Sequence, residues 1–252
     1  MKKISITSNI LKIIGITCMI FDHIGYYFFE NIDIQVFYMF RIIGRIAMPI
    51  FTFLLVQGFF HTKNLKKYLL KIFGMAVFTQ LILFILQFMF NRYTNLKYID
   101  LVSCLNILFS FSLIILVLKS FSNLVKNKLN FILIIFIFLL YYFINFDYSF
   151  RVLILGICFY FCEMYKLRYK NEYIYKILIF ISILLICIDK NILSYFSILS
   201  CIPIFLYNGK LGNKSKKLKN IFYLSFPINH IVIGLISIIL NQVGELWNLK
   251  KI

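Results

Sequence analysis

The sequence predicts an all-α protein, a polytopic transmembrane helix bundle of about nine spans with its N-terminus in the cytoplasm. Three observations predict this fold. The 252 residues are 62% hydrophobic, with a mean hydropathy of +0.90, which is more apolar than a soluble domain with a polar surface can be. Apolar stretches of the roughly 20 residues that cross a bilayer recur along the chain. Basic residues gather in alternate connecting segments.

The nine apolar stretches lack the period-2 alternation of barrel strands, so they favour helices. The first follows Lys2 and Lys3 like a signal peptide, but Asp22 and His23 interrupt it, and it is interpreted as a retained anchor. The sixth to eighth are short. In order, they lie near Ile10–Phe29, Phe37–Phe60, Tyr68–Phe90, Leu101–Leu118, Leu129–Phe146, Phe150–Tyr165, Ile174–Ile188, Ile192–Tyr207 and Ile221–Gln242. One membrane domain covers residues 1–252.

Charge placement predicts the orientation. Most of the 27 Lys and Arg residues lie in the segments 2–12, 63–71, 119–128, 166–176 and 210–219, which all face the cytoplasm if the N-terminus does. The net charge of +18 is therefore interpreted as a signature of topology and of contact with the lipid bilayer, not of nucleic-acid binding.

Ionisable residues inside apolar stretches mark candidate functional positions, because each is costly at membrane depth unless it is paired or hydrated. Asp22 and His23 lie in the first stretch, Arg41 and Arg45 in the second, and His230 in the last. Depths counted along the helices overlap, so a shared cavity is expected. No metal site is expected, because the histidines and carboxylates are few and dispersed.

Helical geometry limits how these groups can cooperate. Asp22 and His23 are consecutive, about 100° apart, and cannot pair with each other. Arg41 and Arg45 share one face, and Pro49 is expected to kink the helix one turn later. Two interpretations stay open: a buried ion pair between Asp22 and an arginine that only fixes packing, or a site whose surplus positive charge binds an anionic ligand.

Several blocks in this order resemble the TraX family of membrane acetyltransferases. The similarity covers most of the chain. The blocks are Asp22-His23-Ile24-Gly25-Tyr26-Tyr27, the run 40–51 (FRIIGRIAMPIF), the run 58–64 (GFFHTKN) with Tyr68, Asn106-Ile107-Leu108-Phe109-Ser110, Asp147-Tyr148, the run 206–212 (LYNGKLG) and Phe226-Pro227-Ile228-Asn229-His230.

The resemblance implies an acyltransferase that uses acetyl-CoA as cosubstrate and needs no metal. His230 is then expected to be a general base or transient acetyl acceptor, with Arg41 or Arg45 polarising a carbonyl or holding a carboxylate. Asp22 would orient a histidine or accept the amine proton, and His23 would belong to the same site. Lys63, Lys67 and His61 are expected to bind the coenzyme A phosphates, although His61 could equally extend to the membrane interface with no such role.

The expected acceptor is the N-terminal amine of a pilin, another exported peptide or a glycan, in the cytoplasmic membrane of a bacterium. Two other classes stay open. A small membrane transporter would also bury charges, although it would more often show paired repeats with Gly or Pro breaks, and none are visible. A non-enzymatic accessory protein would need no charges inside its spans.

Overall fold

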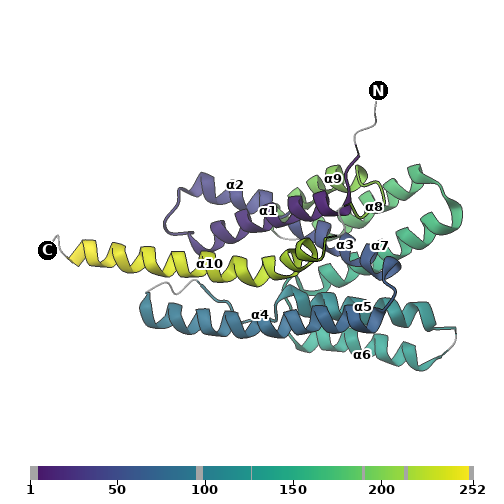
Figure 1. Cartoon of the computed structure of the whole chain (residues 1–252), viewed down its shortest axis with the longest axis horizontal. Helices are drawn as coiled ribbons and strands as arrows, with labels where there is room; N and C mark the ends of the chain where they lie inside the picture. Colours follow the sequence, from purple (N-terminus) through teal and green to yellow (C-terminus); the bar gives the residue numbers. More distant parts are fainter. Residues whose placement is uncertain (1–4, 95–98, 126, 189–190, 213–214, 250–252) are drawn as a thin grey trace.

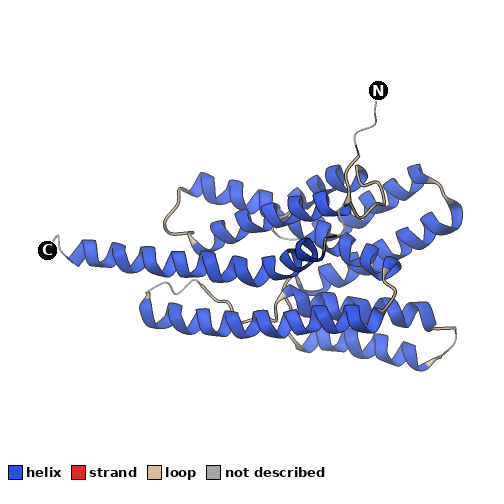
Figure 2. Cartoon of the chain, in the orientation of Figure 1, coloured by secondary structure: helices blue, strands red, loops and turns tan. Residues whose placement is uncertain are grey.

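The computed structural model describes residues 5–94, 99–125, 127–188, 191–212 and 215–249, and every named element in these ranges is a helix (Figure 2). The all-α prediction is therefore confirmed. The helices are α1 (Ser8–Tyr27), α2 (Ile34–Gly44), α3 (Ala47–His61), α4 (Leu65–Tyr93), α5 (Ile107–Asn123), α6 (Leu129–Phe143), α7 (Ser149–Tyr169), α8 (Glu172–Cys187), the 3-10 helix η1 (Ile192–Ser200), α9 (Cys201–Phe205) and α10 (Lys216–Leu249).

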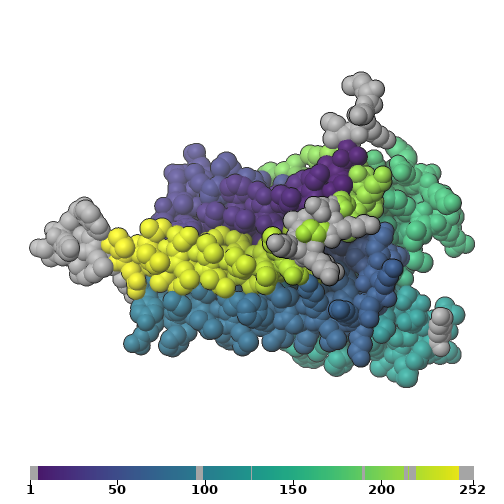
Figure 3. Space-filling view, viewed as in Figure 1, coloured from purple at the N-terminus to yellow at the C-terminus, as the bar shows by residue number. Residues whose placement is uncertain are grey.

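The helices run roughly along the long axis of the molecule (Figure 1). α1 packs against α2, and α10 packs on both α1 and α4. The space-filling view shows α10 as a band between the purple α1 and the blue α4 (Figure 3). α10 thus packs between the α1–α2 pair and α4. Helices α5 to α9 form the other half of the bundle.

Four helical stretches of the described chain are long and apolar enough to cross a membrane. They are Ser8–Tyr27, Ile34–His61, Leu65–Tyr93 and Asn220–Val243, and shorter apolar helices accompany them. The count of nine spans and the cytoplasmic N-terminus therefore stay predictions. Of the basic residues behind the predicted orientation, Lys2, Lys3, Lys97, Lys126, Lys190, Lys214, Lys250 and Lys251 lie outside the described residues.

The second predicted stretch, Ile34–His61 in the structure, is locally distorted between α2 and α3. A tight turn occupies Arg45 and Ile46, where Ile46 N–H donates to the Ile43 carbonyl at 3.2 Å. Pro49, in the first turn of α3, is the physical cause. It has no N–H to donate to the carbonyl of Arg45, and its ring crowds that carbonyl. Arg45 and Ile46 keep right-handed helical dihedral angles, so the predicted stretch Phe37–Phe60 is helical throughout, with a local distortion that lies inside the candidate site.

The fourth predicted stretch was expected to be helical from Leu101, but α5 begins at Ile107. Residues 99–106 run back along α4 instead, and two glutamines of α4 bond to their backbone. Gln87 accepts from Leu101 N–H at 2.7 Å and donates to the Ile99 carbonyl at 3.0 Å, and Gln80 accepts from Asn106 N–H at 3.0 Å. Side chains thus satisfy backbone groups that a helix would otherwise have satisfied.

The eighth predicted stretch, Ile192–Tyr207, is also not one α-helix. It consists of η1 followed by the short α9, which together end at Phe205. Cap residues explain where other helices start. The Asn106 side chain accepts from Leu108 N–H at 3.1 Å to begin α5, and the Asn171 side chain accepts from two backbone N–H groups to begin α8.

The start of α1 lies in a cradle formed by residues 206–212. Ser8 N–H donates to the Lys210 carbonyl at 2.8 Å, and Asn9 N–H donates to the Leu211 carbonyl at 3.2 Å. These bonds satisfy donors that the first turn of a helix leaves open. Gly212 has φ +86°, and a Cβ there would lie 2.8 Å from Thr7 Oγ1, so both the conformation and the close approach favour glycine.

Candidate functional site

A cavity of about 1160 Å³ passes through the centre of the bundle. Its lining at one end includes Lys12, His61 and Lys63. At the other end it includes Asp22, Arg41, Arg45 and Asp147, and both His23 and His230 lie in the wall. The expectation of a shared cavity for the buried ionisable residues is confirmed, because α1, α2 and α10 bring them to one cavity.

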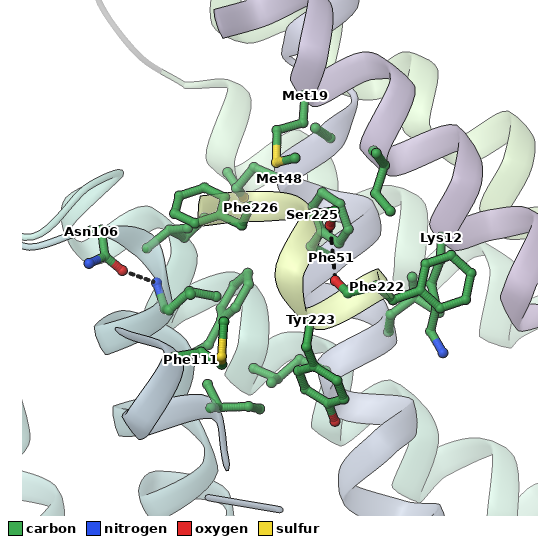
Figure 4. Close-up of a pocket in the computed structure, with 18 of the residues that line it drawn as sticks. Lys12, Met19, Met48, Phe51, Asn106, Phe111, Phe222, Tyr223, Ser225 and Phe226 are labelled. Atoms are coloured by element: carbon green, nitrogen blue, oxygen red, sulfur yellow. Dashed lines mark hydrogen bonds between the residues drawn. The ribbon is translucent and has the colours of Figure 1, made fainter. Parts of the chain in front are cut away.

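Apolar side chains line the middle of this cavity (Figure 4). Phe222, Tyr223 and Phe226 lie on one turn of α10, and Met19 of α1 and Met48 of α3 flank Phe226. Lys12 lies beside Phe222 in the same view, with its Nζ 5.0 Å from the centre of the ring. The cavity therefore changes from basic to apolar to ionic along its length.

Asp22 pairs with both arginines. The same oxygen, Oδ1, lies 2.9 Å from Nη1 of Arg41 and 2.7 Å from Nη2 of Arg45. Gly44 leaves the room for this arrangement, because a Cβ there would overlap the Asp22 carboxylate. The expectation that Asp22 orients a histidine is wrong, since the partners of its carboxylate are the two arginines. The predicted ion pair exists, and it is open to the cavity.

His23 and His230 lie side by side, with ring centres 4.2 Å apart. The amide nitrogen of Asn229 is 2.7 Å from Nδ1 of His23, and the Tyr27 hydroxyl is 2.9 Å from Nδ1 of His230. Phe226 packs edge-on against both rings. The Nε2 atom of each ring has no hydrogen-bond partner among the described residues. Each imidazole is thus fixed through Nδ1, while both rings line the cavity.

A strained turn between α6 and α7 adds an acid to the arginine end. Tyr148 and Ser149 both have positive φ, +60° and +48°, a conformation that costs energy for residues other than glycine. The Tyr148 ring lies 5.6 Å from the guanidinium carbon of Arg45. Burial raises the pKa of Asp147 to about 6, Asp22 adds to the rise, and Arg45 opposes it. Asp147 therefore offsets part of the expected surplus of positive charge.

Asp147 and Arg151 lie on either side of the start of α7. Asp147 precedes the helix, and its N–H donates to the Leu105 carbonyl at 2.9 Å. Arg151 donates to Ser194 Oγ at 3.2 Å. Both residues line the cavity, so they belong to the candidate site.

The residues expected to bind coenzyme A are only partly brought together. His61 and Lys63 line the cavity, and Nδ1 of His61 lies 2.8 Å from the Gln57 carbonyl oxygen. Lys67 is exposed in the first turn of α4 and is not part of the cavity wall, so the structure does not place it with the other two. The region of the cavity near Lys12, which was not predicted, is basic as well.

Sequence reasoning missed the buried carboxyl of Glu163 in α7. Its Oε1 accepts short hydrogen bonds from the Gln57 amide and the Tyr175 hydroxyl. The signal was present, since Glu163 is an acid inside the sixth apolar stretch. Asn229 and Tyr27 lie in the family-like blocks but had no predicted role. Among the described residues, no three His, Cys, Asp or Glu side chains form a group that could hold a metal ion.

Fold and site together define a multi-pass helical membrane protein with a buried ionic and histidine-containing cavity. The chain belongs to the TraX family, since the protein-family model described as "TraX protein" matches residues 7–237. The resemblance seen in the sequence is thereby confirmed. A relative named probable fimbrial assembly protein FimC, serogroup H1, from Dichelobacter nodosus is 36% identical over 70 residues, which are 28% of this chain and 28% of that protein. No solved structure matches the chain.

Proposed function

We propose that this protein is an integral membrane acetyltransferase that moves an acetyl group from acetyl-CoA on the cytoplasmic side to an amine or hydroxyl on the outer side. The cavity is the observation that supports it. One continuous space connects the basic residues Lys12 and Lys63 to the ionic group around Asp22. Its volume of about 1160 Å³ slightly exceeds the roughly 300–1,000 Å³ of typical small-molecule pockets, so it has room for a large ligand.

The basic end suits the donor. Lys12, His61 and Lys63 surround an opening to which a polyanion such as coenzyme A would be attracted. The apolar middle, with Met19 and Phe226 in its wall, would exclude water from the thioester and its arm. The acetyl group would then reach the histidine pair from the basic side.

The histidine pair can divide the chemistry between two rings. Because an amide nitrogen only donates, Nδ1 of His23 accepts from Asn229 and the ring proton lies on Nε2. That Nε2–H would donate to the thioester oxygen as negative charge develops there. If Nδ1–H of His230 donates to the Tyr27 oxygen, its Nε2 lone pair is free to accept a proton.

The proposed reaction is a balanced acyl transfer. The acceptor amine attacks the acetyl carbonyl carbon, a carbon–nitrogen bond forms, and the carbon–sulfur bond of the thioester breaks. His230 takes the amine proton and returns it to the leaving thiolate, so the products are an acetylated amine and free coenzyme A.

The ionic end would receive the acceptor. Arg41 and Arg45 can bind a carboxylate or phosphate of the acceptor, and Asp22 and Asp147 can bind a cationic amine. Family membership and the printed name of the Dichelobacter relative make the N-terminal amine of a pilin the first acceptor to test, before other exported peptides and glycans.

The test is transfer of radiolabelled acetyl from acetyl-CoA by purified protein in liposomes, with a pilin peptide whose N-terminus is free or blocked. His230→Ala and His23→Ala should each lower kcat by about 10²–10⁴, and Arg45→Ala should lower transfer to the acceptor. Asn171→Ala, which changes a helix cap away from the cavity, is the control.

Two results would argue against the proposal. If neither coenzyme A nor a labelled acceptor is formed with any peptide or glycan, the protein is not this enzyme, and a transporter or accessory role takes its place. Full activity in His230→Ala would remove the assigned base while leaving acetyl transfer in place.

A further inference from the structure

Gln57 of α3 presents an unused hydrogen-bond acceptor to the cavity. The residue is 7% exposed and lies in the cavity wall. Its Nε2 donates to Glu163, and its backbone carbonyl oxygen lies 2.8 Å from Nδ1 of His61. Oε1 of its side chain has no partner among the residues that the structure describes. An acceptor without a protein partner in a cavity wall is available to a hydrogen-bond donor of a ligand.

Glu163 determines which end of the Gln57 amide faces the cavity. Oε1 of Glu163 also accepts from the Tyr175 hydroxyl, so this oxygen acts as an acceptor for two donors. An acceptor selects the Nε2 end of the amide. The other end of the amide, Oε1, is therefore left as an acceptor and not as a donor, in a residue of the cavity wall.

The position of Gln57 identifies the part of the donor that it would meet. It lies one turn of α3 from His61, about 6 Å along the helix axis at 1.5 Å per residue. In the other direction along α3, Met48 lies near Phe226, which packs on the histidine pair. Gln57 thus lies between the basic end of the cavity and the histidines, where the flexible arm of an acyl donor would pass.

We infer that Gln57 binds an amide N–H of the acyl donor's arm, and that Glu163 is the positioning residue that keeps the Gln57 acceptor turned toward it. The inference rests on the proposed function, and it names the chemical class of donor that the cavity selects. Coenzyme A thioesters carry amide groups between the phosphates and the sulfur, whereas simple alkyl thioesters do not.

Kinetics with acetyl-CoA give the first test. Gln57→Leu should raise KM for acetyl-CoA roughly three- to tenfold, the value of one hydrogen bond, with kcat changed less than about twofold. Glu163→Gln should raise KM in the same direction but less, because Gln57 is no longer held in one orientation. Ser182→Ala is the matched control. Ser182 is buried in α8, it contacts Cys162, which precedes Glu163 in the chain, and it does not line the cavity.

A pair of donors separates amide recognition from a general loss of packing. The acetyl thioester of N-acetylcysteamine contains the amide, and an S-alkyl thioacetate of the same length does not. Wild type should prefer the amide-containing donor, and Gln57→Leu should use both equally. A preference that survives in Gln57→Leu overturns the inference. Loss of the preference in Gln57→Leu but not in Glu163→Gln overturns the role given to Glu163.

The outcomes also separate this inference from the proposed function. Acetyl transfer by wild type with an unchanged KM in Gln57→Leu refutes the inference alone. If wild type transfers no acetyl group, binding of coenzyme A is measured directly. Equal affinities of wild type and Gln57→Leu then refute the inference, and tighter binding by wild type supports it even though the enzymatic proposal has failed.

Discussion

Gly44 shows how one residue without a side chain determines the ionic group. Both arginines reach a single oxygen of Asp22, and the carboxylate lies directly against the Gly44 backbone. A buried ion pair is strongly destabilised when one partner is displaced, because the other charge stays behind without compensation. The glycine is thus required by the neighbouring carboxylate and not by an unusual φ.

Gly44→Ala should therefore destabilise the protein by about 3 kcal/mol or more, because the new methyl group displaces Asp22 from Arg41 and Arg45. Thermal unfolding in detergent measures it. Gly74→Ala is the control, since a Cβ at Gly74 meets nothing within 4 Å on an exposed face of α4 and should stabilise by about 0.5–1 kcal/mol. Equal melting temperatures for the two variants would contradict this account.

Asn229 determines which nitrogen of His23 carries the proton. Asn229→Asp would replace the donor to Nδ1 by an acceptor, so the proton would move to Nδ1 and Nε2 would become an acceptor. If His23 acts as proposed, kcat should fall about 10²–10⁴-fold with little change in KM for acetyl-CoA. Asn241→Asp adds the same charge to α10 outside the cavity and serves as control. Unchanged kcat in Asn229→Asp would refute the assigned tautomer.

Among the elements, the segment 99–106 is held to α4 by side chains, and Asn106 is central to it. Its side chain caps α5 and donates to the Ala76 carbonyl at 2.9 Å, and its backbone N–H donates to Oε1 of Gln80. The segment carries Asp100, Leu101 and Cys104 into the cavity wall. The stability of one loop and the shape of the site thus depend on the same residue.

Asn106→Ala should lower both stability and acetyl transfer, while Asn171→Ala should lower stability alone. Each loses an N-cap worth about 1 kcal/mol, but Asn106→Ala also loses the side-chain hydrogen bonds to the Ala76 carbonyl and Gln80 and so releases part of the cavity wall. Unfolding and transfer assays on both variants give the comparison. Equal transfer rates would show that the segment does not shape the site.

The turn between α6 and α7 makes stability depend on pH. The pKa of Asp147 in the folded protein, about 6, lies above the 3.8 of an exposed aspartate, so folding favours the neutral carboxyl. The stability that the neutral Asp147 carboxyl contributes is fully present below pH 3.8 and is lost as the pH rises through about 6. Relative to wild type, the melting temperature of Asp147→Asn should rise by a few degrees between pH 4 and 7. A constant difference would contradict the raised pKa.

At the scale of the whole molecule, composition and apolar length predicted the all-α fold. The cost of buried charge predicted that Asp22, His23, Arg41, Arg45 and His230 share a space. These predictions succeeded because each depends on a local property, such as residue type and position along a helix. The partners of the two histidines depend on packing between α1 and α10, which one sequence does not reveal.

The differences from the sequence predictions have separate physical causes. Residues 101–106 were included in an apolar stretch, but the side chains of Gln87 and Gln80 in α4 accept hydrogen bonds from their backbone N–H groups, so no helix forms there. The distortion at Arg45 is different, because it is local and follows from Pro49 four residues later, where the sequence already predicted a kink. Glu163 was overlooked because a single acid did not lower the hydropathy of its stretch enough to stand out.

The predicted orientation can be tested with single cysteines in a background without the six native ones. Glu30→Cys and Lys63→Cys lie at exposed positions in segments predicted to face opposite sides. A membrane-impermeant maleimide should label the variant at position 30 in intact cells, and the variant at position 63 only after permeabilisation. The reverse pattern would place the basic segments outside and remove cytosolic acetyl-CoA as the donor.

The cradle that residues 206–212 form around the start of α1 has a consequence for biosynthesis. A chain emerging from the ribosome can neutralise Asp22 as soon as Arg41 and Arg45 have been made, so the first hairpin can enter the membrane without an unpaired charge. The beginning of α1 and the His23 ring must wait for partners from the last fifth of the chain. The ionic half of the site is thus assembled early, and the histidine half is completed only when translation is almost finished.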